Sequence, residues 1–444
     1  AASDVYKRQL LAYLIKAMLY YVITVVGHRM GVLVESDMRR DVFTHMQDLS
    51  CSFYDKNRTG VLMSRITSDL FEVTELAHHG PENILICSLT IVGALVMMFF
   101  MQWRLALVLA VVLPLCFWFT LSQRVRMKNA NLEVKRKTAE IYAAIESSIS
   151  GIRTAKAFAN EGQESRKFDA ANAMFRGSKV EYYRSMGLYM SGMEFTTGIM
   201  QVVVITVGGA LIMAGLMDYI ELVTFSLYVS AFVSPVRKLA QFAEQYMQGS
   251  AGFARFLELM RTEAAIKDAE DALVLEKVSG RVDFNHVSFD YGNGVPVLSD
   301  IELHIRPGES LAVVGPSGGG KSTLANLVCR FFDVQSGSVR VGGADVRDIP
   351  KEELMDTISF VFQNSRLIKA SIFENVRLGK PEATREEVMA ALKNAQCDDI
   401  LEKLPDGMDT VIGTKGVYLS GGEQQRIAIA RVMLKNTPII ILDE

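Results

Sequence analysis

Apolar and polar residues alternate in long blocks through the first 260 residues of the chain. Five apolar runs cover about 10–26, 84–101, 105–121, 195–215 and 219–236. A helix needs about 20 apolar residues to cross the hydrocarbon core of a bilayer, so these runs suffice at the short end of the range. One such run could be a buried helix of a soluble protein, whereas five in one half of a chain predict membrane spans.

The apolar runs pair into tight hairpins. Only residues 102–104 separate the second run from the third, and a few residues near 216–218 separate the fourth from the fifth. Long polar stretches, about 27–83 and 122–194, lie between the pairs and carry Lys and Arg close to the spans. Because Lys and Arg mark the cytoplasmic flank of a span, we expect the polar stretches in the cytoplasm and the hairpin turns outside.

The polar stretches themselves have a helical pattern. The segment KNANLEVKRKTAEIYAAIESSISGIRTAKAF has few helix breakers and carries apolar residues at helical spacing. The spans are therefore predicted to continue as helices well beyond the membrane, with turns marked by Gly60 and Gly151.

The character of the chain changes after Met260. A charged segment, RTEAAIKDAEDALVLEKVSG, has the composition of a linker, and from Val282 onward short β-rich runs alternate with helical ones. The runs VDFNHVSFDY and SLAVV are predicted strands, and KSTLANLVCRFF is a predicted helix, which is the rhythm of an α/β domain. The predicted boundaries are a transmembrane domain at 10–262, a linker at 263–280 and an α/β domain at 281–444.

Composition supports a membrane protein. Half of the residues are hydrophobic and the mean hydropathy is +0.20, while the net charge of −3 says nothing about partners; we expect no nucleic acid. The five cysteines are scattered without a metal-binding or disulfide spacing. Lys16, Glu194 and Glu221 are candidates for binding a transported substrate, but all lie near span ends, where reaching to the membrane interface is favoured.

A phosphate-binding loop follows the run SLAVV. Residues 315–323 read GPSGGGKST and match the pattern G-x-x-x-x-G-K-[ST] between a predicted strand and a predicted helix. Glycines let consecutive backbone N–H groups converge on phosphate oxygens, and the helix N-terminus adds its positive end. In this pattern Lys321 neutralises charge on the β- and γ-phosphates, and Ser322 ligates magnesium. The sequence therefore predicts binding of ATP with Mg²⁺.

An apolar strand at the end of the chain supplies a second part of such a site. Residues 438–443 read PIIILD, and an acid at the end of a strand beside the phosphate loop holds the magnesium ion. Asp443 is the predicted metal ligand, and Glu444 is the predicted general base for the attacking water. Without the phosphate loop upstream, both would be ordinary polar residues at a strand end.

The stretch between the loop and the acid carries a family resemblance. LSGGEQQRIAIARVML, residues 419–434, resembles the signature motif of the ATP-binding-cassette family and its helix, with Glu423 where Gln is usual. Ser420, Gly421 and Gly422 at the helix N-terminus would form a second phosphate clamp. One chain cannot close both clamps on one ATP, so the resemblance implies that two cassettes sandwich each nucleotide.

The resemblance also assigns residues that would otherwise be read as a core aromatic and a surface amide. Tyr291 resembles the aromatic residue that stacks on adenine, and Gln363 resembles the switch-loop glutamine that reaches magnesium. Thr414 and Lys415 stand where the family's exporters usually have Glu-Arg. The predicted nucleotide site comprises Tyr291, Gly315, Pro316, Ser317, Gly318, Gly319, Gly320, Lys321, Ser322, Thr323, Gln363, Ser420, Gly421 and Gly422, with Ser322, Gln363 and Asp443 on magnesium and Glu444 as the catalytic residue.

The membrane half resembles exporters in which six spans are fused to one cassette. MRRDVFTHMQDLSCSFYDKNRTGVLMSRITSDL is similar to their first intracellular loop, whose short coupling helix docks on a cassette, and GIRTAKAFANEGQESRKF is similar to the stretch after their second coupling helix. The expected fold is an all-α transmembrane helical bundle with five of six spans, followed by a truncated α/β P-loop ATPase cassette. We expect a fragment that lacks the first span and everything after Glu444, with residues 1–9 foreign to the domain and little turnover of its own.

The implied function is ATP-driven export by a half-transporter. Its expected partners are a second half-transporter, identical or different, membrane lipid and an unidentified substrate. Its expected place is the plasma (inner) membrane of a bacterium, with the cassette on the cytoplasmic side. An importer is disfavoured because importer cassettes usually lie on separate chains. The alternative is an ATP-gated channel or regulatory ATP-binding module, against which Glu444 argues because a module that does not hydrolyse ATP can dispense with that carboxylate.

Overall fold

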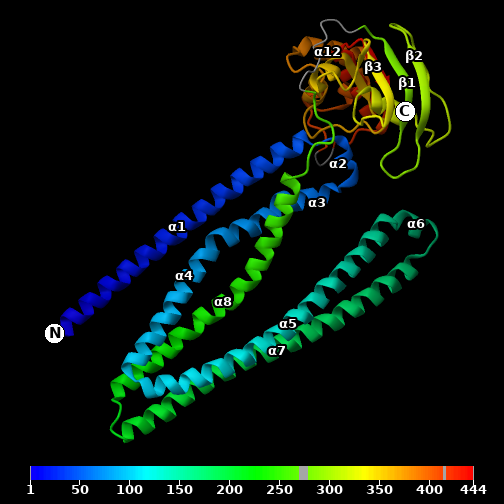
Figure 1. Ribbon diagram of the computed structural model, residues 1–444. Helices are drawn as coiled ribbons and strands as arrows, with labels where there is room; N and C mark the ends of the chain where they lie inside the picture. The colour runs from blue at the N-terminus through cyan, green and yellow to red at the C-terminus, as the bar shows by residue number, and fades with distance from the viewer. Residues whose placement is uncertain (1, 270–278, 414–416, 444) are drawn as a thin grey trace. The chain divides into compact units, whose positions relative to one another are not determined.

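The computed structural model describes residues 2–269, 279–413 and 417–443 (Figure 1). The chain forms two compact units, each made of two separate stretches. The first unit comprises 1–38 and 68–255, and the second comprises 39–67 and 256–444.

Long helices make up the first unit, and two of them, α1 and α8, continue into the second. The helices are α1 (Ala2–Asp48), α4 (Leu70–Met101), α5 (Trp103–Ser150), α6 (Ile152–Ala157), α7 (Glu161–Met213) and α8 (Tyr219–Met260), with a π-helix, η1 (Arg65–Asp69), leading into α4.

Four helical segments among the described residues are long and apolar enough to cross a membrane. They are Asp4–Asp48, Thr59–Met101, Trp103–Ser150 and Glu161–Met213, and they contain the first three predicted spans and residues 195–213 of the fourth. The fifth predicted span, 219–236, lies in α8. Its apolar part among the described side chains, Tyr219–Ala231, is shorter, so that span stays a prediction.

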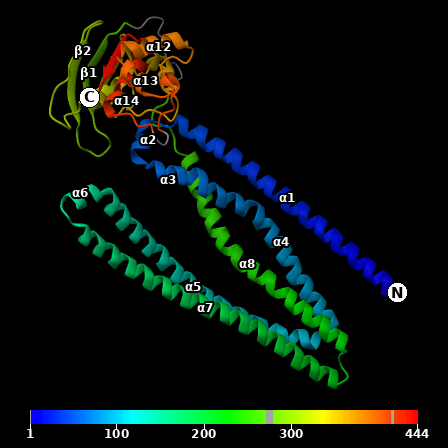
Figure 2. The same cartoon turned by 180° about the vertical axis from the view of Figure 1, so that it is seen from behind.

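The prediction that the polar stretches continue the spans as helices is confirmed. α1 runs without a break to Asp48, and α5 and α7 extend far beyond their apolar runs, side by side as Figure 2 shows from behind. Gly151 ends α5 and marks a turn, as predicted. The predicted turn at Gly60 is wrong: the helix break lies at Asn57 and Arg58, and Gly60 is in the first turn of α3.

The two tight turns of the first unit share one core. Where α4 meets α5 and α7 meets α8, all four helices contribute to one apolar cluster, in which Met98, Leu105 and Phe225 are at most 2% exposed. The side-chain amide of Gln102, in the first turn, donates a hydrogen bond of 2.7 Å to the carbonyl of Leu216, in the second. The two hairpins predicted from the sequence are therefore joined at their turns.

α4 and α8 approach closely at two glycines of α8. A Cβ atom at Gly249 would lie 2.6 Å from the Cβ of Leu76, and one at Gly252 would lie 2.9 Å from the carbonyl oxygen of Asp69. Asp69 also accepts hydrogen bonds of 2.6 and 2.7 Å from Nε and Nη2 of Arg255. Small residues let the two backbones meet, as is usual for helix pairs in membranes.

The second unit begins with the segment that links α1 to α4. This segment folds as the end of α1, α2 (Cys51–Lys56) and α3 (Thr59–Ser64), and it packs against the end of α8. Val42, Leu62 and Leu259 lie in this cluster and are at most 3% exposed.

The remainder of the second unit is an α/β domain, as predicted. An antiparallel sheet has the strand order β2-β1-β3-β4, and β5 and β6 form a separate parallel pair. The strands are β1 (Val282–Phe289), β2 (Leu298–Ile305), β3 (Ser336–Val341), β4 (Ala344–Asp345), β5 (Ile358–Val361) and β6 (Ile439–Leu442). The helices are α9 (Lys321–Val328), α10 (Lys351–Thr357), α11 (Ile372–Arg377), α12 (Arg385–Asn394), α13 (Asp398–Lys403), the 3-10 turn η2 (Gly407–Asp409) and α14 (Gly421–Lys435). One core joins the strands to α9 and α10, and another lies among α11 to α14.

One predicted strand is wrong. Residues 310–314, SLAVV, pair with no strand among the described residues, and Leu311, Val313 and Val314 are 46%, 48% and 89% exposed. An apolar run becomes a strand only when a neighbouring strand takes up its backbone hydrogen bonds. β6 has β5 as its partner, and residues 310–314 form no such ladder beside it.

Candidate functional site

The glycine-rich loop 315–320 leads directly into α9. Gly320 caps this helix with a φ of +83°, in the left-handed region that favours glycine. A Cβ atom at Gly320 would also lie 2.7 Å from Cδ2 of Leu298 and 3.1 Å from the carbonyl oxygen of Val297. Backbone angle and packing both require glycine here, and the resulting loop-to-helix junction is the arrangement that binds phosphate groups.

Lys321 lies across the same loop. Its Nζ donates hydrogen bonds of 3.0 Å to the carbonyl of Gly315 and 2.9 Å to the carbonyl of Pro316. These bonds hold the ammonium charge against the loop that would surround the phosphates.

Ser322 and Asp443 come together at the start of α9. The Oγ of Ser322 donates a hydrogen bond of 2.8 Å to Oδ1 of Asp443, which follows the last residue of β6. The backbone N–H of Asp443 donates to the carbonyl of Val361, at the end of β5. A hydroxyl and a carboxylate oxygen are ligands that Mg²⁺ prefers, so the donor set fits the predicted metal.

Gln363 lies just beyond the end of β5 and is exposed. Because β5 and β6 run parallel, with Val361 opposite Leu442, their carboxyl ends reach the same edge. The structure therefore places Gln363 and Asp443 at one edge of this strand pair.

Tyr291 is tied to the phosphate loop by a contact that the sequence does not reveal. Its hydroxyl lies 2.8 Å from Oγ1 of Thr323, and its ring packs edge-on against Phe289 and Phe332. The residue is 42% exposed, so it is not enclosed by its neighbours and can still meet a ligand. The sequence analysis did not predict that Phe332 supports the ring of Tyr291. The aromatic pair Phe331-Phe332 after α9 was the one sequence feature that could have indicated it.

A pocket of about 640 Å³ opens beside Tyr291 within the second unit. Its walls include Ser52, Asp55 and Lys56 from α2 and the rings of Tyr291, Phe331 and Phe332. The short helix of the segment that resembles a coupling loop thus borders the same pocket as the predicted adenine-stacking ring.

The predicted signature motif begins α14. Ser420 caps this helix in a capping box with Glu423, whose Oε2 accepts bonds of 2.7 Å from the backbone N–H and 2.9 Å from the hydroxyl of Ser420. The hydrogen bond from the Ser420 backbone is the main cause that lowers the pKa of Glu423. Gly421 and Gly422, in the first turn, are exposed and can approach a ligand.

The signature motif and the phosphate loop belong to different cores of the domain. α14 packs among the helices α11 to α13, whereas α9 packs against the strands. Glu444, Thr414 and Lys415 lie outside the described residues, so the structure gives them no position.

Comparisons with known proteins agree with the geometry. Residues 9–236 match the family model of the ABC transporter transmembrane region, and residues 298–444 match that of the ABC transporter. The chain is 38% identical to the uncharacterized ABC transporter ATP-binding protein YwjA of Bacillus subtilis (strain 168), over 97% of this chain and 75% of that protein. It is 36% identical to a Staphylococcus aureus protein (strain NCTC 8325 / PS 47) named "Putative multidrug export ATP-binding/permease protein", over 92% of this chain and 71% of that one.

A solved structure shows the same similarity in three dimensions. The structure of a bacterial Atm1-family ABC exporter with ATP bound superimposes with a TM-score of 0.76 at 26% identity. The match covers 95% of this chain and 74% of the exporter.

Proposed function

We propose that two half-transporters of this kind close on two ATP molecules. The premise is that this chain belongs to the ABC transporter family and is an ATP-driven exporter. It is a transport-coupled ATPase with its transmembrane region and its cassette in one polypeptide. The half-transporter fold implies dimerisation. The second half is either another copy of this chain or a related one.

The contact between Ser322 and Asp443 supports most of this proposal. It brings the hydroxyl of Ser322, a predicted magnesium ligand, to the carboxylate of Asp443 at the end of β6. Ser322 and Asp443 would hold Mg²⁺ there, and the ion would neutralise charge that develops on the phosphates. Lys321 would bind the same phosphates, Tyr291 would stack on adenine, and the signature residues would close over the ATP of the partner.

Glu444 would act as the general base that takes a proton from the attacking water. ATP binding draws the two cassettes together and turns the spans outward, and hydrolysis lets the cassettes part again. The alternative, an ATP-gated channel or regulatory module, would bind ATP without turnover linked to substrate movement.

The chain divides into a transmembrane domain at 10–262, a linker at 263–280 and a cassette at 281–444 in this proposal. The family matches at 9–236 and 298–444 support that division. The protein crosses the membrane several times, and its curated relatives include bacterial proteins. The inner (plasma) membrane of a bacterium, with the cassette in the cytoplasm, follows from the Lys and Arg residues that flank the spans. The name of the Staphylococcus aureus relative favours drug-like organic compounds among the substrate classes.

The test uses inside-out membrane vesicles that contain the protein. ATP should drive uptake of a transported dye, and Lys321→Ala should abolish both uptake and ATP hydrolysis. Lys393→Ala removes an exposed positive charge from α12 and serves as the matched control. Uptake that survives Lys321→Ala unchanged, or ATP binding without any turnover in the unmodified protein, would contradict the proposal.

A further inference from the structure

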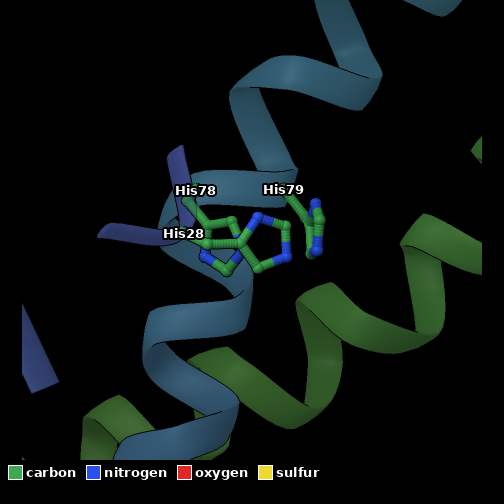
Figure 3. A group of neighbouring side chains, drawn as sticks. All are labelled: His28, His78 and His79. Carbon is green, nitrogen blue, oxygen red and sulfur yellow. The ribbon is translucent and has the colours of Figure 1, made fainter. Parts of the chain in front are cut away.

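Three histidines from two helices of the first unit meet in one place. His28 lies on α1, and His78 and His79 lie next to each other on α4. One nitrogen from each ring lies within 4.8 Å of the others, and the ring centroids are 4.0 to 5.2 Å apart (Figure 3). The chain has six histidines in all, so half of them gather at this point.

Backbone carbonyls orient two of the three rings. Nδ1 of His28 lies 2.7 Å from the carbonyl oxygen of Thr24, and Nδ1 of His78 lies 2.7 Å from that of Thr74. A carbonyl can only accept, so each Nδ1 carries the proton, and in the neutral ring Nε2 keeps a free lone pair. Histidines that bind metals usually donate their other N–H to a carbonyl or carboxylate in this way.

The Nε2 of His78 has no hydrogen-bond partner. The His78 side chain is only 5% exposed. Among the residues that the structure describes, this Nε2 is the one buried side-chain nitrogen or oxygen without a hydrogen-bond partner. Buried polar atoms are nearly always satisfied, so an orphan acceptor between two other imidazoles calls for a ligand.

Two carboxylates complete the surroundings. Glu75 approaches Nε2 of His78 to 3.9 Å through Oε1 and Nε2 of His79 to 3.7 Å through Oε2. Oε2 of Glu82 lies 3.4 Å from Nδ1 of His79, where it can orient that ring from the other side. Three converging imidazoles, with a carboxylate close to two of them, supply ligand types that a tetrahedral Zn²⁺ site uses.

A glycine lies where the two helices bring the rings together. Gly31 lies one turn after His28, and a Cβ atom there would lie 3.0 Å from Nδ1 of His78. The ligands on α4 also share one face, because Glu75, His78 and His79 stand three and four residues apart. The site is therefore built into the packing of α1 on α4.

We propose that His28, His78, His79 and Glu75 bind a divalent transition-metal ion of the Zn²⁺ class, with Glu82 as a positioning residue. The apolar run of α1 ends just before His28, and that of α4 begins just after His79. The ion therefore joins two helices at the same end of their spans, where the exposed His28 gives access from water. This site is separate from the nucleotide site. Binding a metal ion there is a function that ATP-driven export does not require.

The test measures Zn²⁺ binding to the full chain, purified in detergent with a histidine-free tag and stripped with EDTA. Isothermal titration with ZnCl₂ should give one ion per chain. His78→Ala should weaken binding at least about 10-fold, since loss of even an outer partner of a ligand costs roughly 10- to 100-fold in affinity. The matched control H286A/H304A removes two exposed histidines of the second unit and should leave the titration unchanged.

Co²⁺ serves as a second probe, because a tetrahedral Co²⁺ site absorbs visible light far more strongly than Co²⁺ in water. The unmodified protein should show this absorption, E75Q should shift it, and H28A should remove it. His28 is exposed, so its replacement tests the site even if His78→Ala fails to fold. Gly31→Ala keeps every ligand and should still weaken Zn²⁺ binding. No Zn²⁺ binding by the unmodified protein, or equal binding by H28A, would overturn the proposal.

Discussion

Ser322 donates a hydrogen bond of 2.8 Å to Asp443 across 121 positions of sequence. The contact joins the first turn of α9 to the end of β6, and both side chains are exposed or partly exposed. A hydroxyl and a carboxylate held this close can share one magnesium ion with little rearrangement.

The Asp443→Asn variant should lose magnesium-dependent turnover. A bound metal stabilises transition-state charge by several kcal/mol, so we expect hydrolysis to fall at least about 100-fold. ATP binding in EDTA should change little, because the phosphate loop and Tyr291 stay intact. ATPase assays across a magnesium titration check this, with Asp406→Asn as an exposed control. Turnover of Asp443→Asn at the control's rate would remove Asp443 from the metal site.

Two replacements of Tyr291 separate its ring from its hydroxyl. Tyr291→Ala removes the stacking surface and should weaken ATP binding by about 5- to 150-fold, since base–aromatic stacking is worth roughly 1–3 kcal/mol. Tyr291→Phe removes only the contact with Thr323 and should cost no more than about 10-fold. Fluorescence titrations with an ATP analogue distinguish the two. Equal losses in both variants would show that the hydroxyl, and not the ring, is what ATP binding needs.

Replacing Glu444 by Gln should trap the cassettes together. The amide keeps the shape of the side chain but cannot take the proton of the attacking water, so turnover should fall roughly 100- to 10,000-fold while ATP still binds. Cysteines at Ser317 and Gly422 should then cross-link between two chains in the presence of ATP and magnesium. The same cysteine pair with Glu444 intact is the control. Normal hydrolysis by Glu444→Gln would refute the role given to Glu444.

Thiol labelling in intact cells tests the orientation of the spans. Trp103→Cys should react with a membrane-impermeant maleimide, and Asn57→Cys should not, because positively charged flanks stay inside. Among the native thiols, the exposed Cys51 must be replaced first. Burial raises the pKa of Cys329 to about 12 and that of Cys397 to about 11, so both stay protonated near neutral pH and unreactive. The opposite labelling pattern would invert the topology.

The ion pair between Asp69 and Arg255 should stabilise the first unit. Asp69 is 13% and Arg255 43% exposed at the side chain, so Asp69→Asn should cost about 1–3 kcal/mol, less than a fully buried pair would. Thermal unfolding in detergent provides the measurement, and the exposed Asp169→Asn is the control. The double variant Asp69→Asn/Arg255→Gln should lose less than the sum of the single losses. Strict additivity would mean that the two side chains act independently.

Part of the candidate nucleotide site is local in sequence, and that part could be predicted. The glycines and Lys321 occupy one loop, whereas the contact of Asp443 with Ser322 spans 121 positions and was predicted only from the acid that ends the last apolar strand. The bond from Tyr291 to Thr323 could not be predicted, since it depends on how β1 and α9 pack across 32 positions. The strand predicted at 310–314 was wrong for the same reason, because the strand that would pair with it is set by the folded chain and not by the local sequence.

The helices, too, could be predicted only in part. Periodicity predicted their extension beyond the membrane, since helical spacing needs no distant partner. The contact of His28 with His78 and His79 could not be predicted, because the spacing within α4 does not say which helix faces it. The glycines of α8 gave no signal either, since a close helix crossing is visible only when both helices are placed.

The bond from Gln102 to Leu216 fixes the two turns of the first unit to each other at one end of its helices. The four helices that meet there share a core, while α5 and α7 extend away from it to α6. α5 has 48 residues, a length of roughly 70 Å at 1.5 Å per residue, so a tilt of about 5° at the turns would move its far end by about 6 Å. A tilt that leaves the shared core intact would therefore displace the α6 end of α5 by about the rise of one helix turn.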